Sequence, residues 1–317
     1  MSFDIIGTGK CVPEKILTND ELSGMMDTSD EWILTRTGIR ARFISRGESL
    51  LDLGAGAARQ ALKNAGVEAS SLDLIVVSTV RGDMRTPSLA CLIQGEIGAD
   101  CPAFDVNAAC TGFLYALDVA AAYLDSGRAE HVLVVAAEAM SKQVDWNNRA
   151  TCVLFGDGAG AVVLRKGGGL LSMKLTSKGD DSLLRIPNGE GNSPFNLREA
   201  EPEYLYMAGS EVFQFAVNAM CGGVREVLKE AHLTAEEIRM LIPHQANLRI
   251  LNFAKDRLKL REEQVAVGID RYGNTSSASI PLLLADLTEA GTLKKGDVIA
   301  MAAFGGGLTS GACVIRL

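Results

Sequence analysis

Short runs of β-branched and other apolar residues alternate with longer alanine- and leucine-rich stretches along the chain. Residues 72–80 (LDLIVVSTV) and 132–137 (VLVVAA) predict buried strands, and residues 50–65 and 111–125 predict helices. Continuous apolar strands, as opposed to alternating ones, are typical of parallel sheets that are covered on both faces. Their alternation with helices predicts βαβ units, and therefore an α/β fold with a mainly parallel sheet.

The second half of the chain repeats the first. The segment VLKEAHLTAEEIRMLI begins at Val227 and matches ALKNAGVEASSLDLIV, which begins at Ala61, an offset of 166 positions (227 − 61). We expect this register to continue without gaps from residue 61 to 137. Such a repeat predicts two related halves, 1–165 and 166–317, that pack as a pseudo-dimer and form a site where their strand ends meet.

The composition narrows the class of protein. The chain has 317 residues, is 47% hydrophobic and 22% charged, and carries a net charge of −8. No apolar run is long enough to span a membrane, and the N-terminus lacks a secretory pattern. Seven scattered cysteines without a CxxC pair argue against a disulfide framework and against structural zinc. We therefore expect a cytoplasmic protein with neither a membrane nor a nucleic-acid partner.

The segment DVNAACTGF (105–113) places Cys110 between a predicted strand and a predicted helix. This thiol could be one more small core residue, because free cysteine is often buried. It could instead be a nucleophile, because a helix that begins at Thr111 would direct its positive end at the sulfur and lower the pKa of the thiol. We interpret five other cysteines as core residues: Cys91, Cys101, Cys152, Cys221 and Cys313.

Two further polar residues are predicted to reach the same sheet edge as Cys110. His244 follows the apolar run MLIP, at the position that the offset pairs with Ser78. Asn274 lies two residues before Ser276, which the offset pairs with Cys110. Three such groups could form a satisfied polar cluster, but their convergence on a helix-start cysteine favours catalysis. A papain-type hydrolase has the same order of cysteine, histidine and asparagine, so the order alone leaves that alternative open.

Four motifs along the chain, DVNAACTGF, PHQANLRI, GNTSSAS and AFGGGLTSG, together resemble those of the β-ketoacyl-acyl carrier protein synthase III family. The segments DEWILTRTGIR and FGDGAGA extend the resemblance from end to end. The family implies a thiolase-like fold, a layered α/β/α/β/α pseudo-dimer, and a homodimeric enzyme without metal or organic cofactor. It also implies condensation of an acyl-CoA primer with malonyl-acyl carrier protein, which initiates fatty acid synthesis.

The resemblance also implies roles for individual residues. Cys110 would carry the acyl group, His244 and Asn274 would stabilise an enolate, and the N–H groups of Cys110 and Gly306 would form an oxyanion hole. The coenzyme A contacts that it implies are Trp32, Arg36, Thr37, Arg149 and Asn247. A basic run that includes Arg249 and Lys255 would dock an acidic carrier protein, although such a run is more often a solvated helix face.

The chain departs from the family pattern at several positions. Thr86 stands before Pro87 in the acyl-pocket loop, where many members carry an aromatic residue, and Gln214 replaces a basic residue that often contributes to carrier docking. A smaller side chain at position 86 predicts a primer that is longer or bulkier than acetyl. Two alternatives therefore stay open: a related condensing enzyme or acyltransferase of secondary metabolism, and a catalytically silent subunit that binds acyl carriers.

Overall fold

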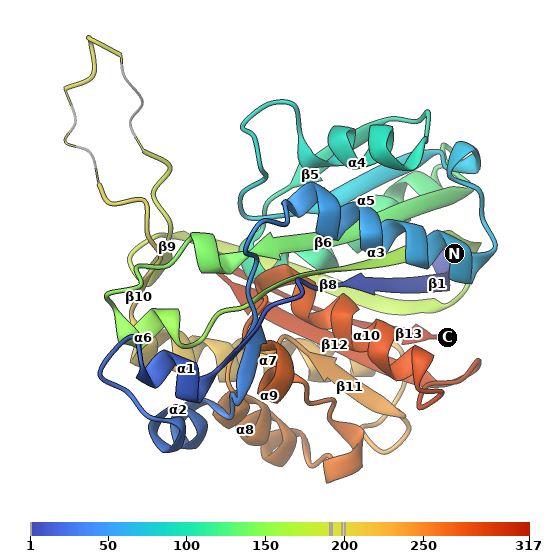
Figure 1. Cartoon of the computed structure of the whole chain (residues 1–317). Helices are drawn as coiled ribbons and strands as arrows, with labels where there is room; N and C mark the ends of the chain where they lie inside the picture. Colours follow the sequence, from blue (N-terminus) through green and yellow to red (C-terminus); the bar gives the residue numbers. More distant parts are fainter. Residues whose placement is uncertain (1, 190–192, 198, 200) are drawn as a thin grey trace.

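The computed structural model describes residues 2–189, 193–197, 199 and 201–317, and its main feature is a pair of central sheets (Figure 1). The first sheet has the strand order β1-β7-β6-β4-β5, and the second has the order β11-β12-β13-β8. The strands of the first sheet are β1 Ser2–Cys11, β4 Leu74–Ser78, β5 Ala103–Val106, β6 His131–Ala139 and β7 Asp157–Gly167. Those of the second are β8 Leu170–Asp180, β11 Met240–Pro243, β12 Val298–Gly305 and β13 Gly307–Arg316.

Helices cover both sheets, and two short strand pairs lie outside them. The helices are α1 Asn19–Ser23, α2 Asp30–Thr37, α3 Leu50–Ala65, α4 Leu89–Ile97, α5 Gly112–Asp125, α6 Arg149–Cys152, α7 Gly209–Glu230, α8 Leu248–Leu258, α9 Ile269–Tyr272 and α10 Ser279–Glu289. The short 3-10 turns are η1 Ala69–Ser71, η2 Ala109–Thr111, η3 Met140–Lys142, η4 Glu262–Gln264 and η5 Ser276–Ala278. The small pairs are β2 Ile16–Thr18 with β3 Ala41–Phe43, and β9 Leu184–Arg185 with β10 Tyr206–Met207. In the described part of the chain, no helix has the length and hydropathy needed to cross a bilayer.

The inner strands β4 and β12 are almost entirely apolar because both faces of each sheet are covered there. Successive side chains of a strand point to opposite faces. Along β4, Leu74 and Val76 enter the core shared with α5 and α10, whereas Ile75 and Val77 enter the core shared with α3 and α4. Strand β12 divides in the same way between the central core and the core beneath α7 and α8. The layers are therefore α3 and α4, the first sheet, α5 and α10, the second sheet, and α7 and α8.

The two sheets share one topology, as the sequence repeat predicts. Strands β1, β7, β6 and β4 occupy the places that β8, β13, β12 and β11 occupy in the second sheet. The place of β5 is taken by Val265, which forms a single parallel bridge with Leu241. The repeated βαβ units are therefore present in both halves.

The expected register, however, is wrong by one residue near Cys110. Strands β4 and β11 begin 166 positions apart (240 − 74), but α5 and α10 begin 167 apart (279 − 112). Ala109 and Ser276, both with a left-handed backbone (φ 48° and 50°), also lie 167 apart (276 − 109). Cys110 therefore corresponds to Ser277, because the connections that contain α4 and α8 differ in length by one residue.

Candidate active site

Cys110 lies in the 3-10 turn η2, between the end of β5 and the start of α5. The preceding Ala109 has a positive φ of 48°, a backbone conformation that costs free energy for a residue with a Cβ and is often found at functional sites. The turn uses the Thr111 and Gly112 N–H groups for bonds to Ala108 and Ala109. The α-helix begins at Gly112, one residue later than predicted, and a 3-10 turn precedes it, so these N–H groups do not point freely at the sulfur.

The expected lowering of the Cys110 pKa is wrong for this structure. Cys110 as a whole residue is half-buried, but its thiol is desolvated, and this raises the pKa of the thiol to about 12. The negative charge of Glu138 also acts to raise it. A hydrogen bond between the thiol and the Ser276 hydroxyl, and one from the Cys110 backbone N–H, act in the opposite direction. Desolvation outweighs these bonds because an anion loses its hydration in an apolar site. The resting side chain is thus a neutral thiol.

His244 follows β11 and is 1% exposed. Its Nδ1 lies 2.8 Å from the Ser279 Oγ, and that oxygen also accepts the Gln245 N–H at 3.3 Å. If the hydroxyl donates to Nδ1, its hydrogen is satisfied and Nε2 carries the imidazole proton; this tautomer is assigned from the network. Burial lowers the pKa of His244 to about 3, so the ring is neutral. It is therefore a hydrogen-bond donor and not a cation.

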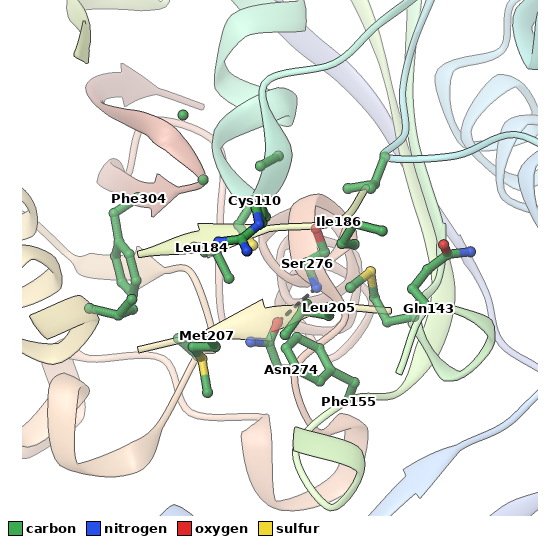
Figure 2. A pocket seen from close by; sticks show the side chains of 18 of the residues that line it. Cys110, Gln143, Phe155, Leu184, Ile186, Leu205, Met207, Asn274, Ser276 and Phe304 are labelled. Carbon is green, nitrogen blue, oxygen red and sulfur yellow. Dashed lines mark hydrogen bonds between the residues drawn. The ribbon is translucent and has the colours of Figure 1, made fainter. Parts of the chain in front are cut away.

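Asn274 is fixed in one orientation by its neighbours. Its Oδ1 accepts the Ser276 N–H at 2.9 Å, and its backbone is tied to Leu154 and Gly156. Because the amide oxygen is occupied by an N–H donor, the amide NH₂ is the group left to face the cavity. Figure 2 shows this bond as a dashed line, with the amide nitrogen directed away from Ser276.

One cavity of about 590 Å³ brings these groups together (Figure 2). Cys110, His244, Asn274 and Gly306 all line it. The Phe304 ring also lines it and meets the His244 ring edge-on, with centroids 5.3 Å apart. The wall includes further apolar side chains, among them Met140, Phe155, Leu184, Ile186, Leu205 and Met207. The cavity is a largely apolar chamber that contains a free thiol, an imidazole and an amide.

The glycine-rich end of β12 lies against the turn that carries Cys110. A Cβ at Gly305 would be only 2.7 Å from the Cys110 backbone nitrogen and 3.2 Å from the Ala109 Cβ. Gly306, the next residue, lies against Ala109 as well. The absence of a side chain at position 305 therefore permits the close approach of two backbone segments from different halves of the molecule.

Sequence reasoning missed an acidic group behind the cavity. Glu138 is the next-to-last residue of β6 and is 1% exposed. Its Oε1 accepts from Ser276 Oγ at 3.1 Å and Ser277 Oγ at 2.7 Å, and its Oε2 accepts from the Val80 N–H at 3.0 Å. Burial raises the pKa of Glu138 to about 7. The detectable signal was a lone carboxylate within the apolar strand HVLVVAAEA.

The residues expected to contact coenzyme A lie in a second group, around α2. The guanidinium carbons of Arg36 and Arg149 lie 4.6 Å and 5.1 Å from the centre of the Trp32 ring. Asn247 lines the cavity, caps α8 and donates to the Arg36 carbonyl at 3.1 Å, which joins α8 to α2. Thr37 is 4% exposed, and its hydroxyl is bonded to the Ile33 carbonyl and the Ile39 N–H. Its hydroxyl is therefore occupied within the chain.

Other expected positions lie apart from the cavity. Thr86 is exposed and does not line it. Arg249 lies over the Phe213 ring at 5.5 Å, and Lys255 is ion-paired with Glu262. Cys91 is exposed, which corrects its interpretation as a core residue, whereas Cys101, Cys152, Cys221 and Cys313 are buried as expected.

Comparison with protein families gives two matches. The family model described as 3-oxoacyl-[acyl-carrier-protein] synthase III matches residues 104–179, and the model of the C-terminal part of the same enzymes matches residues 228–317. These ranges contain Cys110 in the first match and both His244 and Asn274 in the second.

Individual relatives are similar over the whole chain. A β-ketoacyl-[acyl-carrier-protein] synthase III from Aquifex aeolicus is 45% identical over 317 residues, which covers 100% of both chains. The enzyme of that name from Clostridium acetobutylicum is 44% identical over 320 residues, which covers 99% of this chain and 98% of the relative. The crystal structure of 3-oxoacyl-[acyl-carrier-protein] synthase III from Aquifex aeolicus superposes with a TM-score of 0.94 at 44% identity, over 99% of this chain and 100% of the other. The predicted layered fold is thereby confirmed.

A fourth similarity is to a protein of a different pathway. The priming β-ketosynthase of the R1128 polyketide biosynthetic pathway superposes with a TM-score of 0.92 at 37% identity, over 99% of this chain and 96% of the other.

Proposed function

The chain belongs to the β-ketoacyl-[acyl-carrier-protein] synthase III family, and from this premise we propose that it condenses an acyl-CoA primer with malonyl-acyl carrier protein, using Cys110 as the acyl carrier. The product is a β-ketoacyl-acyl carrier protein, which starts a fatty acid chain. The observation that carries this proposal is the convergence of Cys110, His244 and Asn274 on one apolar cavity.

In the first half-reaction, the Cys110 sulfur attacks the thioester carbonyl of the primer. A new C–S bond forms, the bond to the coenzyme A sulfur breaks, and the acyl group stays on the enzyme. The carbonyl oxygen becomes an oxyanion in the transition state, and we assign its stabilisation to the N–H groups of Cys110 and Gly306. The close approach of the Gly305 segment to η2 supports this pairing.

In the second half-reaction, the malonyl thioester loses carbon dioxide, and its α-carbon becomes an enolate. His244 Nε2–H and the Asn274 amide would donate to the thioester oxygen, and the enolate carbon would attack the acyl-Cys110 carbonyl. Neutral donors suit this role because they stabilise the enolate without supplying a proton that would quench it. The lowered pKa of His244, caused by burial, supports this assignment.

The primer would enter past α2. The aromatic face of Trp32 beside Arg36 and Arg149 offers a stacking surface and positive charge for the adenine and phosphates of coenzyme A. Asn247 connects this group to the cavity wall, which supports a continuous path from the nucleotide to the sulfur. Thr37 would contribute only by fixing the end of α2, since its hydroxyl is already bonded.

The carrier protein would dock over α7 and α8. Arg249 is exposed and forms no ion pair with any residue that the structure describes, and its side chain covers Phe213, which lines the cavity. Lys255 is ion-paired with Glu262, so that pair would have to open. Complementary charge would thus guide an acidic carrier chiefly through Arg249.

The homodimer and the cytoplasmic location also belong to this proposal. Strand β5 is the edge of the first sheet, and Ala103–Val106 are all only half-buried. An uncovered edge strand pairs readily with another strand, which supports an association of two chains through β5. Light scattering of the purified protein tests the dimer; a monomeric mass at micromolar concentration would contradict it.

A priming reaction with a larger acyl group is the second candidate. The similarity to the R1128 priming ketosynthase and the small side chain of Thr86 both favour it. Because Thr86 is exposed in the single chain, it could meet an acyl group only if the loop that carries it reached a cavity in another chain.

Intact-mass measurement after exposure to a panel of acyl-CoAs tests the function and the primer together. We expect an acyl adduct that is absent from Cys110→Ser, followed by its loss and the evolution of carbon dioxide on addition of malonyl-acyl carrier protein. Release of free acid without a β-ketoacyl product would indicate a hydrolase. A sharp preference for acetyl-CoA would refute the larger primer while leaving the condensation intact.

A further inference from the structure

The buried carboxylate of Glu138 has no role in the condensation as described so far. It lies near the end of β6, the strand that pairs with β4, and it faces the η5 turn, which carries Ser276 and Ser277. A buried carboxylate costs considerable free energy unless it is well bonded. Three donors satisfy it here, from Ser276, Ser277 and Val80. A buried carboxylate with three donors so close to the proposed nucleophile suggests a chemical role for Glu138.

Ser276 connects this carboxylate to the nucleophile. Its hydroxyl donates to Glu138 Oε1 at 3.1 Å, which leaves its oxygen free to accept the hydrogen bond that it shares with the Cys110 thiol. Both Ser276 and Cys110 line the cavity, and both are labelled in Figure 2. The chain of bonds therefore runs from the thiol through the serine oxygen to the carboxylate.

The backbone of Ser276 is held in a defined conformation. Its φ of 50° is left-handed, a conformation that favours glycine, and its N–H is held by the Asn274 Oδ1 at 2.9 Å. This backbone turns the hydroxyl toward Cys110 and Glu138 together. Ser277, by contrast, donates to Glu138 Oε1 at 2.7 Å and, within the described part of the chain, forms no hydrogen bond with the Cys110 sulfur.

We propose that Ser276 and Glu138 form a proton relay that accepts the Cys110 thiol proton during acylation and returns it when condensation releases the thiolate. This inference rests on the proposed function. Ser276 touches the reacting sulfur and is a catalytic residue in this scheme, whereas Glu138 acts through it.

The protons balance over the two half-reactions. As the Cys110 S–C bond forms, the thiol proton moves to Ser276 Oγ, and the Ser276 proton moves to the Glu138 carboxylate. The bond to coenzyme A breaks, and coenzyme A leaves as a thiolate that takes a proton from water. In the condensation the enolate carbon expels the Cys110 sulfur, and the same relay runs backwards to restore the thiol and the carboxylate.

The alternative acceptor within the site is His244, and its hydrogen bonds make it unsuitable. In the tautomer assigned above, the Ser279 hydroxyl donates to Nδ1, so Nε2 carries the hydrogen and acts as a donor. The thiol needs an acceptor because burial keeps it protonated, and the pKa of Glu138, raised to about 7 by burial, matches that need near neutral pH.

The other charged groups around β6, within the described part of the chain, form no hydrogen bond with Glu138. Asp157 on β7 is bonded to Ser45 and Ser141. The charged residues of the other packed elements are exposed: Asp52, Arg59 and Lys63 on α3, Asp118 and Asp125 on α5, and Arg165 and Lys166 on β7. Strand β4 and the η5 turn contribute no charged residue.

The experiment is the pH dependence of single-turnover acylation by one acyl-CoA, measured by intact mass. In the wild-type protein we expect the rate to rise to a plateau with an inflection near pH 7. In Glu138→Gln and Ser276→Ala the rate should fall by about 10²-fold or more at neutral pH and lose that inflection, because general base catalysis contributes about 10²- to 10⁴-fold. Glu138→Asp should recover part of the rate together with an inflection.

Ser277→Ala is the matched control, because it removes a similar bond to Glu138 but keeps the chain to the sulfur intact. It should retain the inflection, displaced in pH. An unchanged profile in folded Glu138→Gln, with only a uniform loss of rate, would refute the relay and leave Glu138 a purely structural group. If the wild-type protein forms no adduct on Cys110, the proposed function itself fails.

Discussion

The close contact between Gly305 and Cys110 makes a sharp prediction about Gly305→Ala. The new methyl group would lie 2.7 Å from the Cys110 backbone nitrogen, 3.2 Å from the Ala109 Cβ and 3.3 Å from the Cys110 Cβ. The nearest of these atoms belongs to the backbone, so no side-chain rotation relieves the contact. Either β12 or the η2 turn must move.

The expected magnitude follows from what that movement disturbs. Overpacking of a close-packed site typically costs about 1–3 kcal/mol of stability. Misplacement of one oxyanion donor raises the activation barrier by about 2.7–4 kcal/mol, or about 10²- to 10³-fold in rate. We therefore expect Gly305→Ala to remain folded with a lower melting temperature and to acylate Cys110 at least about 10²-fold more slowly than the wild type.

The assay is rapid-quench acylation followed by intact-mass analysis, at a temperature where circular dichroism shows both proteins folded. Gly222→Ala is the matched control, because Gly222 lies exposed within α7 and a Cβ there meets nothing within 4 Å. That control should acylate normally and gain about 0.5–1 kcal/mol of stability. Wild-type acylation by folded Gly305→Ala would refute the assignment of the Cys110 N–H to the oxyanion hole.

Three further changes probe other parts of the site. Asn274→Asp keeps an acceptor for the Ser276 N–H but loses the amide donor, so we expect normal acylation and a condensation rate reduced by about 10²-fold, measured as carbon dioxide release; equal losses in both steps would contradict this. The folded-state pKa of Glu138 is raised from 4.5 to about 7, so its contribution to stability is present below pH 4.5 and is lost as the pH rises through 7. Between these values the wild type should lose about 3 kcal/mol relative to Glu138→Gln in urea unfolding, and parallel curves would show that Glu138 is not held neutral by burial. Arg249→Glu should raise the KM for malonyl-acyl carrier protein at low salt and leave acylation by acyl-CoA unchanged; an equal effect on both substrates would place Arg249 outside a docking surface.

Much of the fold could be predicted from local patterns. The helix at 50–65 has the predicted bounds, because Ser49 caps its start and Gly66 its end. The repeat also predicted the shared topology of the two sheets, since similar patterns of apolar residues fold into similar units. The register failed by one residue near Cys110, because apolar periodicity does not fix the length of the connections that contain α4 and α8.

The site was only partly predictable. His244 follows the end of β11 and Asn274 lies two residues before η5, so their arrival at the cavity follows from the topology. Thr37 was expected to contact coenzyme A, but its hydroxyl is hydrogen-bonded to backbone groups at the end of α2. Glu138 was missed because its relation to Cys110 depends on three segments that are distant in sequence: β6, η2 and η5.

The sequence by itself determined the order of strands and helices, the duplicated plan, and the residue types that carry the chemistry, since these depend on patterns within short stretches. The tertiary structure alone decided the protonation states: a neutral thiol at Cys110, a neutral donor at His244 and a carboxylate that titrates near pH 7 at Glu138. The physical reason is that the cost of desolvating a charge depends on all the atoms that surround it, and those atoms come from both halves of the folded chain.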